Sequence, residues 1–242
     1  MPLIELSDYT LAHVGSGQGI NAFYFSLKKG DVCAIDTQNP DDARAFLRAL
    51  ASLVYPVRGT YRFKGKRMDV RSYRDMLPCK REIGYIAPDA ALISNLTLRQ
   101  NILVQRYFFE NDLSINVDDK IRRLCDTSHI AEKLDQRPSD LNKMEVQMAI
   151  VIREISKNPD VLLLDRPEDF IGHANFDMLV QLFKDWIADK KPVVFLSYDR
   201  RLIRRFASRK ILITNGTLTT VEVNGTAKMN HNPAGGMHRS TK

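Results

Sequence analysis

Three short, uninterrupted apolar runs constrain the fold of this chain more than any other feature of its sequence. They are DVCAI at residues 31–35, VLLLD at 161–165 and PVVFL at 192–196. Strands that are apolar along most of their length are buried on both faces, as in parallel sheets covered by helices. Helical spacing of apolar residues follows the first run, over residues 46–53. The sequence therefore predicts an α/β fold with a mostly parallel sheet.

Other segments predict additions to this sheet. The alternating pattern at residues 23–27 predicts one of a set of antiparallel N-terminal strands, and residues 210–223 predict a hairpin that turns at an Asn-Gly pair. Residues 96–156 carry mostly helical patterns, which predicts a helical subdomain inserted into the sheet. We expect one domain over residues 1–222 and a disordered polar tail over 223–242.

Composition and cysteine usage argue against several classes of protein. The chain has 242 residues, of which 44% are hydrophobic, and this is enough for a sizeable core. Its three cysteines are far apart and form no CxxC pair, so we expect neither a disulfide framework nor a zinc site, but a reducing compartment. We expect no signal peptide and no membrane span. His231 and His238 lie in the polar tail, where a metal site is not favoured, and no cofactor is expected.

The chain is basic, with a formal net charge of +7 and a pI of about 9.3. This charge is compatible with nucleic acid, an acidic lipid surface or an acidic protein, and it selects none of them. Two runs, residues 64–74 and 199–210, concentrate the basic side chains. The second has the spacing of an amphipathic helix with a solvated face. Neither contains a nucleic-acid reader motif, so nucleic acid is not the partner we expect.

The order of four segments resembles the ATP-binding cassette of ABC transporters over about residues 1–222. The segments are FSLKKGDVCAI, REIGYIAPDAALISNLTLRQNI, DLNKMEVQMAIVIREISKNPDVLLLDRP and PVVFLSYD. Within the family, residues 91–101 and 111–120 are most similar to the lipid-transporting, mammalian-cell-entry branch. The resemblance implies a P-loop-NTPase-like sheet with a helical subdomain, and a permease as partner.

At the positions where the resemblance implies nucleotide chemistry, this chain lacks the residues of the family. The phosphate loop is the first such position. A working loop is GxxxxGK[ST], whose glycines, lysine and hydroxyl hold phosphate and Mg²⁺. Here the equivalent positions hold Thr37, Gln38, Asn39, Pro40, Asp41, Asp42, Ala43 and Arg44. Pro40 has no N–H to donate. Asp41 and Asp42 place negative charge where phosphate binds, which costs about 4 kcal/mol per charge pair at 4 Å and an effective dielectric near 20. Both acids also suit the positive end of a helix.

The other positions that carry chemistry in the family also lack the residues of the family. Pro88 stands at the glutamine-loop position, and Tyr198 at the switch histidine. Arg166 stands at the catalytic glutamate, beside Asp165 at the magnesium aspartate. The signature motif is replaced by Leu141, Asn142, Lys143, Met144 and Glu145. An ATPase needs a carboxylate where this chain has a guanidinium, which cannot accept a proton.

A glycine-rich stretch, GSGQG at residues 15–19, has a different interpretation. It resembles a dinucleotide loop in composition only, because it precedes a strand and opens no helix. We expect a flexible turn between two N-terminal strands.

These observations predict a non-catalytic, pseudo-ATPase subunit of a membrane transport complex. Its expected partners are a permease and an active ATPase subunit or a second copy of the chain. Its expected location is cytoplasmic and peripheral, on the inner face of the cytoplasmic membrane. The alternative is an ABC-type ATPase with an atypical nucleotide site that uses Arg44, Asp165 and Arg166.

Overall fold

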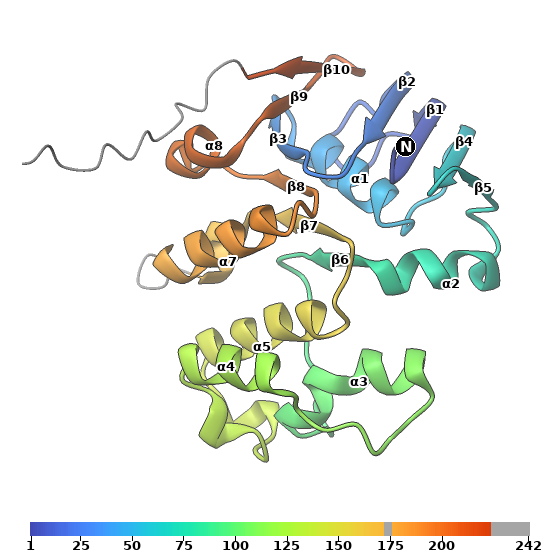
Figure 1. The fold of residues 1–242 in the computed structure, drawn as a ribbon. Helices are drawn as coiled ribbons and strands as arrows, with labels where there is room; N and C mark the ends of the chain where they lie inside the picture. Colours follow the sequence, from blue (N-terminus) through green and yellow to red (C-terminus); the bar gives the residue numbers. More distant parts are fainter. Residues whose placement is uncertain (172–175, 224–242) are drawn as a thin grey trace, which may run out of the picture.

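The computed structural model describes residues 1–171 and 176–223, and its larger sheet has six strands within these ranges (Figure 1). Their spatial order is β10-β9-β3-β8-β7-β6. The strands are β3 Val32–Thr37, β6 Ile83–Ile86, β7 Val161–Asp165, β8 Val193–Leu196, β9 Arg209–Thr214 and β10 Thr217–Glu222. The other five strands pair in parallel, and β10 pairs antiparallel with β9. The predicted α/β fold with a mostly parallel sheet is confirmed.

The smaller sheet is antiparallel and has the order β2-β1-β4-β5. Its strands are β1 Ile4–Leu11, β2 Ile20–Leu27, β4 Arg58–Phe63 and β5 Lys66–Met68. Alternate side chains of β4 are buried, as expected for a sheet that is covered on one face. The predicted antiparallel N-terminal strands are confirmed.

Helices fall into two groups. Those beside the sheets are α1 Pro40–Leu50, α2 Tyr73–Glu82, α6 Pro167–Ile171, α7 Phe176–Ala188 and α8 Arg200–Phe206. A second group lies below the large sheet in Figure 1 and comprises α3 Leu98–Glu110, α4 Asp119–Thr127, η1 Ala131–Lys133, η2 Pro138–Asp140 and α5 Lys143–Ser156. This second group is the helical subdomain.

Helix α1 connects the two sheets and sets the position of the candidate site. Its buried Phe46 packs edge-on against Phe23 and Phe25 of the small sheet. On the large sheet, helix α1 contacts β3, β7 and β8. The start of α1 therefore lies near the carboxyl ends of the parallel strands, the edge at which α/β proteins bind ligands.

The polar C-terminal tail was predicted to be disordered. Residues 224–242, with His231 and His238, lie outside the described residues, so this stays a prediction.

Candidate functional site

The loop between β3 and α1 is held by hydrogen bonds among its own residues and by one from the Asn39 side chain to the Ser16 carbonyl at 2.7 Å. The side chain of Asn39 caps α1 by accepting a hydrogen bond from the Asp41 N–H at 2.9 Å. The hydroxyl of Thr37 donates to the Asn39 carbonyl at 2.8 Å and accepts from the Asn39 N–H at 3.1 Å. The cap at Asn39 and the proline at the next position give α1 a well-defined start.

A second loop, residues 15–19 between β1 and β2, binds the first turn of α1, and we call it the capping loop. The Ser16 N–H and hydroxyl both donate to Asp41 Oδ2, at 2.9 and 2.8 Å. The Gln18 and Gly19 N–H groups donate to the two carboxylate oxygens of Asp42, at 3.1 and 2.8 Å. Our prediction placed this loop between two strands correctly but gave it no partner. We predicted that the two acids suit the positive end of α1, and this prediction did not include their contacts with the capping loop.

Glycines allow the capping loop to approach this closely. A Cβ atom at Gly15 would overlap the Asp41 carboxylate, and one at Gly17 would overlap the Asp42 carboxylate. Gly15 also has a positive φ of 59°, which side chains disfavour. Gly15 and Gly17 thus serve a contact with carboxylates of the same chain.

The capping loop also tunes the charge of Asp41. The Ser16 backbone N–H, followed by the Ser16 hydroxyl, holds the pKa of Asp41 below its ordinary value. A lowered pKa means that this contact stabilises the fold at neutral pH and is lost only as pH falls through the lowered value. Asp42 is 5% exposed, and the two loop N–H groups donate to its carboxylate oxygens.

Asp165 at the end of β7 is fully buried, and Arg44 of α1 binds it. The distance from Arg44 Nε to Asp165 Oδ2 is 2.8 Å. This hydrogen bond is the main reason why the pKa of Arg44 is raised. Arg166 Nε lies 3.6 Å from the other oxygen, Oδ1, which has no hydrogen-bond partner among the described residues. The sequence singled out all three residues, and the structure brings them together.

This carboxylate does not suit a divalent cation. Mg²⁺ prefers an octahedron of oxygen ligands. Around Asp165 the structure places two guanidinium groups, from Arg44 and Arg166, which repel a cation. Among the residues that the structure describes, no cluster of three or more His, Cys, Asp or Glu could hold a metal ion.

The remaining predicted positions lie apart from this pair. Pro88 is exposed in the turn after β6, and its neighbour Asp89 pairs with Arg48 of α1 at 2.8 Å. Tyr198 is exposed after β8, where its N–H donates to Glu168 Oε1 at 2.7 Å.

The predicted signature residues, 141–145, open helix α5 in the helical subdomain. Asn142 caps α5 by accepting from the Glu145 N–H at 3.0 Å. Glu145 in turn accepts from the Asn142 N–H at 2.9 Å and pairs with Lys133 at 2.6 Å. The carboxylate of Glu145 therefore occupies the positive end of α5, while Lys143 and Met144 remain exposed.

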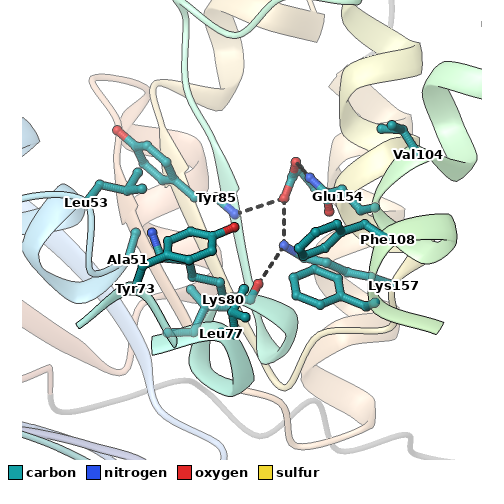
Figure 2. A pocket seen from close by; sticks show the side chains of 13 residues that line it. Ala51, Leu53, Tyr73, Leu77, Lys80, Tyr85, Val104, Phe108, Glu154 and Lys157 are labelled. Atoms are coloured by element: carbon teal, nitrogen blue, oxygen red, sulfur yellow. Dashed lines mark hydrogen bonds and ion pairs between the residues drawn. The ribbon is translucent and has the colours of Figure 1, made fainter. Parts of the chain in front are cut away.

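A groove of about 460 Å³ lies between the sheet-bound helix α2 and the helical subdomain (Figure 2). Its walls carry Tyr73 and Phe108, which are 63% and 59% exposed. At its floor Lys157 Nζ lies 3.1 Å from Glu154 and donates to the Lys80 carbonyl at 3.1 Å. Both side chains of this ion pair are 7% exposed, so the floor is held rigidly between the two parts of the molecule.

Comparison with known proteins identifies the family to which this architecture belongs. The model of the ABC transporter family matches residues 21–169, more than half of the chain. The chain belongs to the ABC transporter family. Among curated relatives, a methionine import ATP-binding protein of Haemophilus influenzae is 22% identical over 80% of this chain and 56% of its own length. A molybdenum import ATP-binding protein of Brucella melitensis is 25% identical over 79% of this chain and 53% of its own length.

Solved structures support the same family at the level of fold. A dimeric ATP-binding cassette named MJ0796, bound to ADP and phosphate, has a TM-score of 0.76 and 19% identity. The match covers 92% of this chain and 99% of that cassette. This chain spans only about half the length of the two import proteins above. Among the residues that the structure describes, no helix is both long and apolar enough to cross a bilayer.

Proposed function

We propose that this chain is a non-catalytic ABC-type subunit that acts as a structural or regulatory partner in a membrane transport complex. The observation that supports the proposal is that side chains of the chain itself contact one another at the positions where the resemblance implies nucleotide and metal. Asp41 and Asp42 lie at the start of α1, where the family binds phosphate, and the capping loop satisfies them. Arg44 lies on Asp165, where the family binds Mg²⁺.

Electrostatics and backbone geometry both oppose nucleotide at this place. A phosphate at the start of α1 would meet two carboxylates, and each charge pair at 4 Å costs about 4 kcal/mol at an effective dielectric near 20. The N–H groups of Ser16, Gln18 and Gly19 already donate to those carboxylates. Ala43 stands where the family has the lysine that reaches phosphate, and Arg166 where it has the carboxylate that handles water.

Purified chain is expected to show no micromolar affinity for Mg-ATP in titration calorimetry. Ala43→Lys is expected not to restore binding, because Pro40, Asp41 and Asp42 remain. No ATP hydrolysis above background is expected either. Clear nucleotide affinity after the single substitution would show that the loop is only one residue from function. Turnover that persists through purification and disappears in Asp165→Ala would support the alternative, an ABC-type ATPase with an atypical site.

The partner we infer is a permease subunit, received in the groove between α2 and the helical subdomain. Aromatic walls above a rigid floor suit an apolar or amphipathic helix laid into the groove. The Arg48–Asp89 pair and the bond from Lys157 to the Lys80 carbonyl bind the elements around it to one another, so the groove does not need nucleotide to keep its shape. An active cassette or a second copy of the chain is a further partner in this scheme, and the location is peripheral on the cytoplasmic side.

Tyr73→Ala/Phe108→Ala is expected to reduce the recovery of a multi-span permease at least tenfold when the chain is purified from native membranes in mild detergent. Truncating an aromatic side chain at the centre of an interface commonly costs more than about 1 kcal/mol. The matched control is Tyr24→Ala, because Tyr24 is 69% exposed on β2 of the small sheet and does not line the groove. Equal recovery with both variants, with the permease identified by mass spectrometry, would place the contact elsewhere.

Lipid is the class of cargo that the sequence favours. Residues 91–101 and 111–120 are most similar to the lipid-transporting branch of the family. The relatives named above handle methionine and molybdenum, so the cargo rests on this resemblance alone.

A further inference from the structure

The basic side chains of residues 62–74 have no part in the proposed nucleotide-free subunit, and the β4–β5 pairing brings several of them together. This segment comprises the end of β4, all of β5 and the start of α2. We call the surface that these side chains occupy the basic edge, and its members are Arg62, Lys66, Arg67, Arg71 and Arg74. Among the described residues, none of these five side chains has a carboxylate within ion-pair distance. By contrast, the neighbouring Arg58 pairs with Asp8, and Lys64 pairs with Glu82 and Asp160.

The strand register brings two of these charges directly together. Arg62 of β4 lies opposite Arg67 of β5, while their neighbours Tyr61 and Met68 point into the core. Like charges directly opposite each other in a sheet destabilise it. Arg67 also lies on the last strand of its sheet, where a charged side chain blunts pairing with another chain. Edge protection accounts for a charge on β5 alone. Arg62 lies between Arg67 of β5 and Glu5 of β1, and Arg71 and Arg74 lie outside the sheet.

Beside this pair the surface is hollowed and carries exposed apolar side chains. A polar hollow of about 500 Å³ is lined by Arg58, Arg67 and Arg71 together with Asp69 and Asp75. Asp69 accepts a hydrogen bond from the Arg71 N–H at 3.0 Å, which holds the turn before α2. The exposed apolar side chains are those of Tyr55, Val57 and Tyr73.

We propose that the basic edge binds the anionic headgroups of a phospholipid membrane. Unpaired guanidinium groups complement phosphate, and basic residues near an anionic membrane surface are each attracted to it. Exposed tyrosines beside them match the headgroup region, where tyrosine is enriched. The position rests on the proposed function: Tyr73 and Lys80 of α2 line the permease groove, so the basic edge continues outward from it (Figure 1).

The second basic run supplies a charge-matched control on the far side of the molecule. Arg200 and Arg204 are exposed on α8, which lies at the opposite side of the sheets from α2 in Figure 1. Arg67→Glu/Arg71→Glu and Arg200→Glu/Arg204→Glu change the net charge equally. Only Arg67→Glu/Arg71→Glu changes the basic edge, so an effect of net charge alone would weaken binding equally in both variants.

The test is flotation of the purified full chain with vesicles of phosphatidylcholine, with or without phosphatidylglycerol. We expect binding only to vesicles that contain phosphatidylglycerol, and weaker binding at high salt. Arg67→Glu/Arg71→Glu should weaken it by at least about twenty-five-fold, because each basic side chain lost at an anionic surface changes affinity by about fivefold and each new glutamate is repelled. The α8 variant should bind like the unchanged chain, and circular dichroism should show that both variants are folded.

Three results would overturn the proposal. They are equal binding to neutral vesicles, an equal loss in the α8 variant, and retention of a DNA oligonucleotide by the basic edge with no binding to vesicles. The last result would assign the surface to nucleic acid. The vesicles contain no permease and no ATP, so this test is independent of the proposed function. ATP turnover would overturn that function and leave vesicle binding intact.

Discussion

Replacing Arg44 by methionine is expected to lower the free energy of unfolding by about 3–5 kcal/mol, because it leaves a buried carboxylate without its partner. Asp165 is 0% exposed, and among the described residues the 2.8 Å bond to Arg44 Nε is its only ion pair of hydrogen-bond length. Methionine keeps most of the apolar stem of arginine, so the loss reports the charge. Chemical denaturation of the full chain measures it.

Arg48→Met is the matched control for this substitution. Arg48 lies one turn further along α1 and also pairs with an aspartate, Asp89, at 2.8 Å. Its side chain and that of Asp89 are 34% and 67% exposed, so its loss should cost only about 0–1 kcal/mol. Adding Asp165→Asn to Arg44→Met should recover part of the stability, since it removes the buried charge. If the two arginine variants are equally stable, Arg44 does not hold the site together.

Asp42→Ala is expected to lower the free energy of unfolding by about 2–4 kcal/mol and to release the capping loop. The substitution removes two hydrogen bonds to a charged group, each worth about 1.5–3 kcal/mol, and adds back some helix propensity. It also leaves the buried N–H of Gly19 without a partner. Amide hydrogen exchange at Gln18 and Gly19 measures the release directly, beside the denaturation curve.

Two companion variants separate charge from shape at this contact. Asp42→Asn keeps one acceptor oxygen and loses the charge, so its effect should be intermediate. Asp41→Ala should have a smaller effect than Asp42→Ala, because the Asp41 contact with Ser16 is exposed. Fast exchange at Gln18 and Gly19 in the unchanged chain would contradict the contact itself.

The architecture could be predicted from the sequence where burial is periodic or continuous. The apolar runs at β3, β7 and β8 and the spacing of α1 were sufficient, because burial on both faces leaves little choice of residue type. Helix α2, residues 73–82, was missed. It contains Pro78 and five charged side chains among its ten residues, so it has little of the apolar periodicity that predicts a helix.

The candidate site could be predicted only in part. Asn142 at the start of α5 was identifiable as a cap, because capping depends on neighbours in sequence. The Arg44–Asp165 pair joins residues 121 positions apart, and no local pattern indicates it. The contacts of the capping loop were still harder to predict from the sequence. Its contacts use the backbone N–H groups of Gln18 and Gly19, and every residue except proline carries such a group.

The Arg44–Asp165 pair also affects how stability depends on the surroundings of the protein. A protein that binds a ligand only when folded becomes more stable as the ligand concentration rises, by mass action. Here the cation that neutralises Asp165 is covalently part of the chain, so its concentration at the site is fixed. On the proposed function, the melting temperature should therefore stay constant across the range of Mg-ATP found in a cell. The subunit would keep one shape when nucleotide is plentiful and when it is depleted.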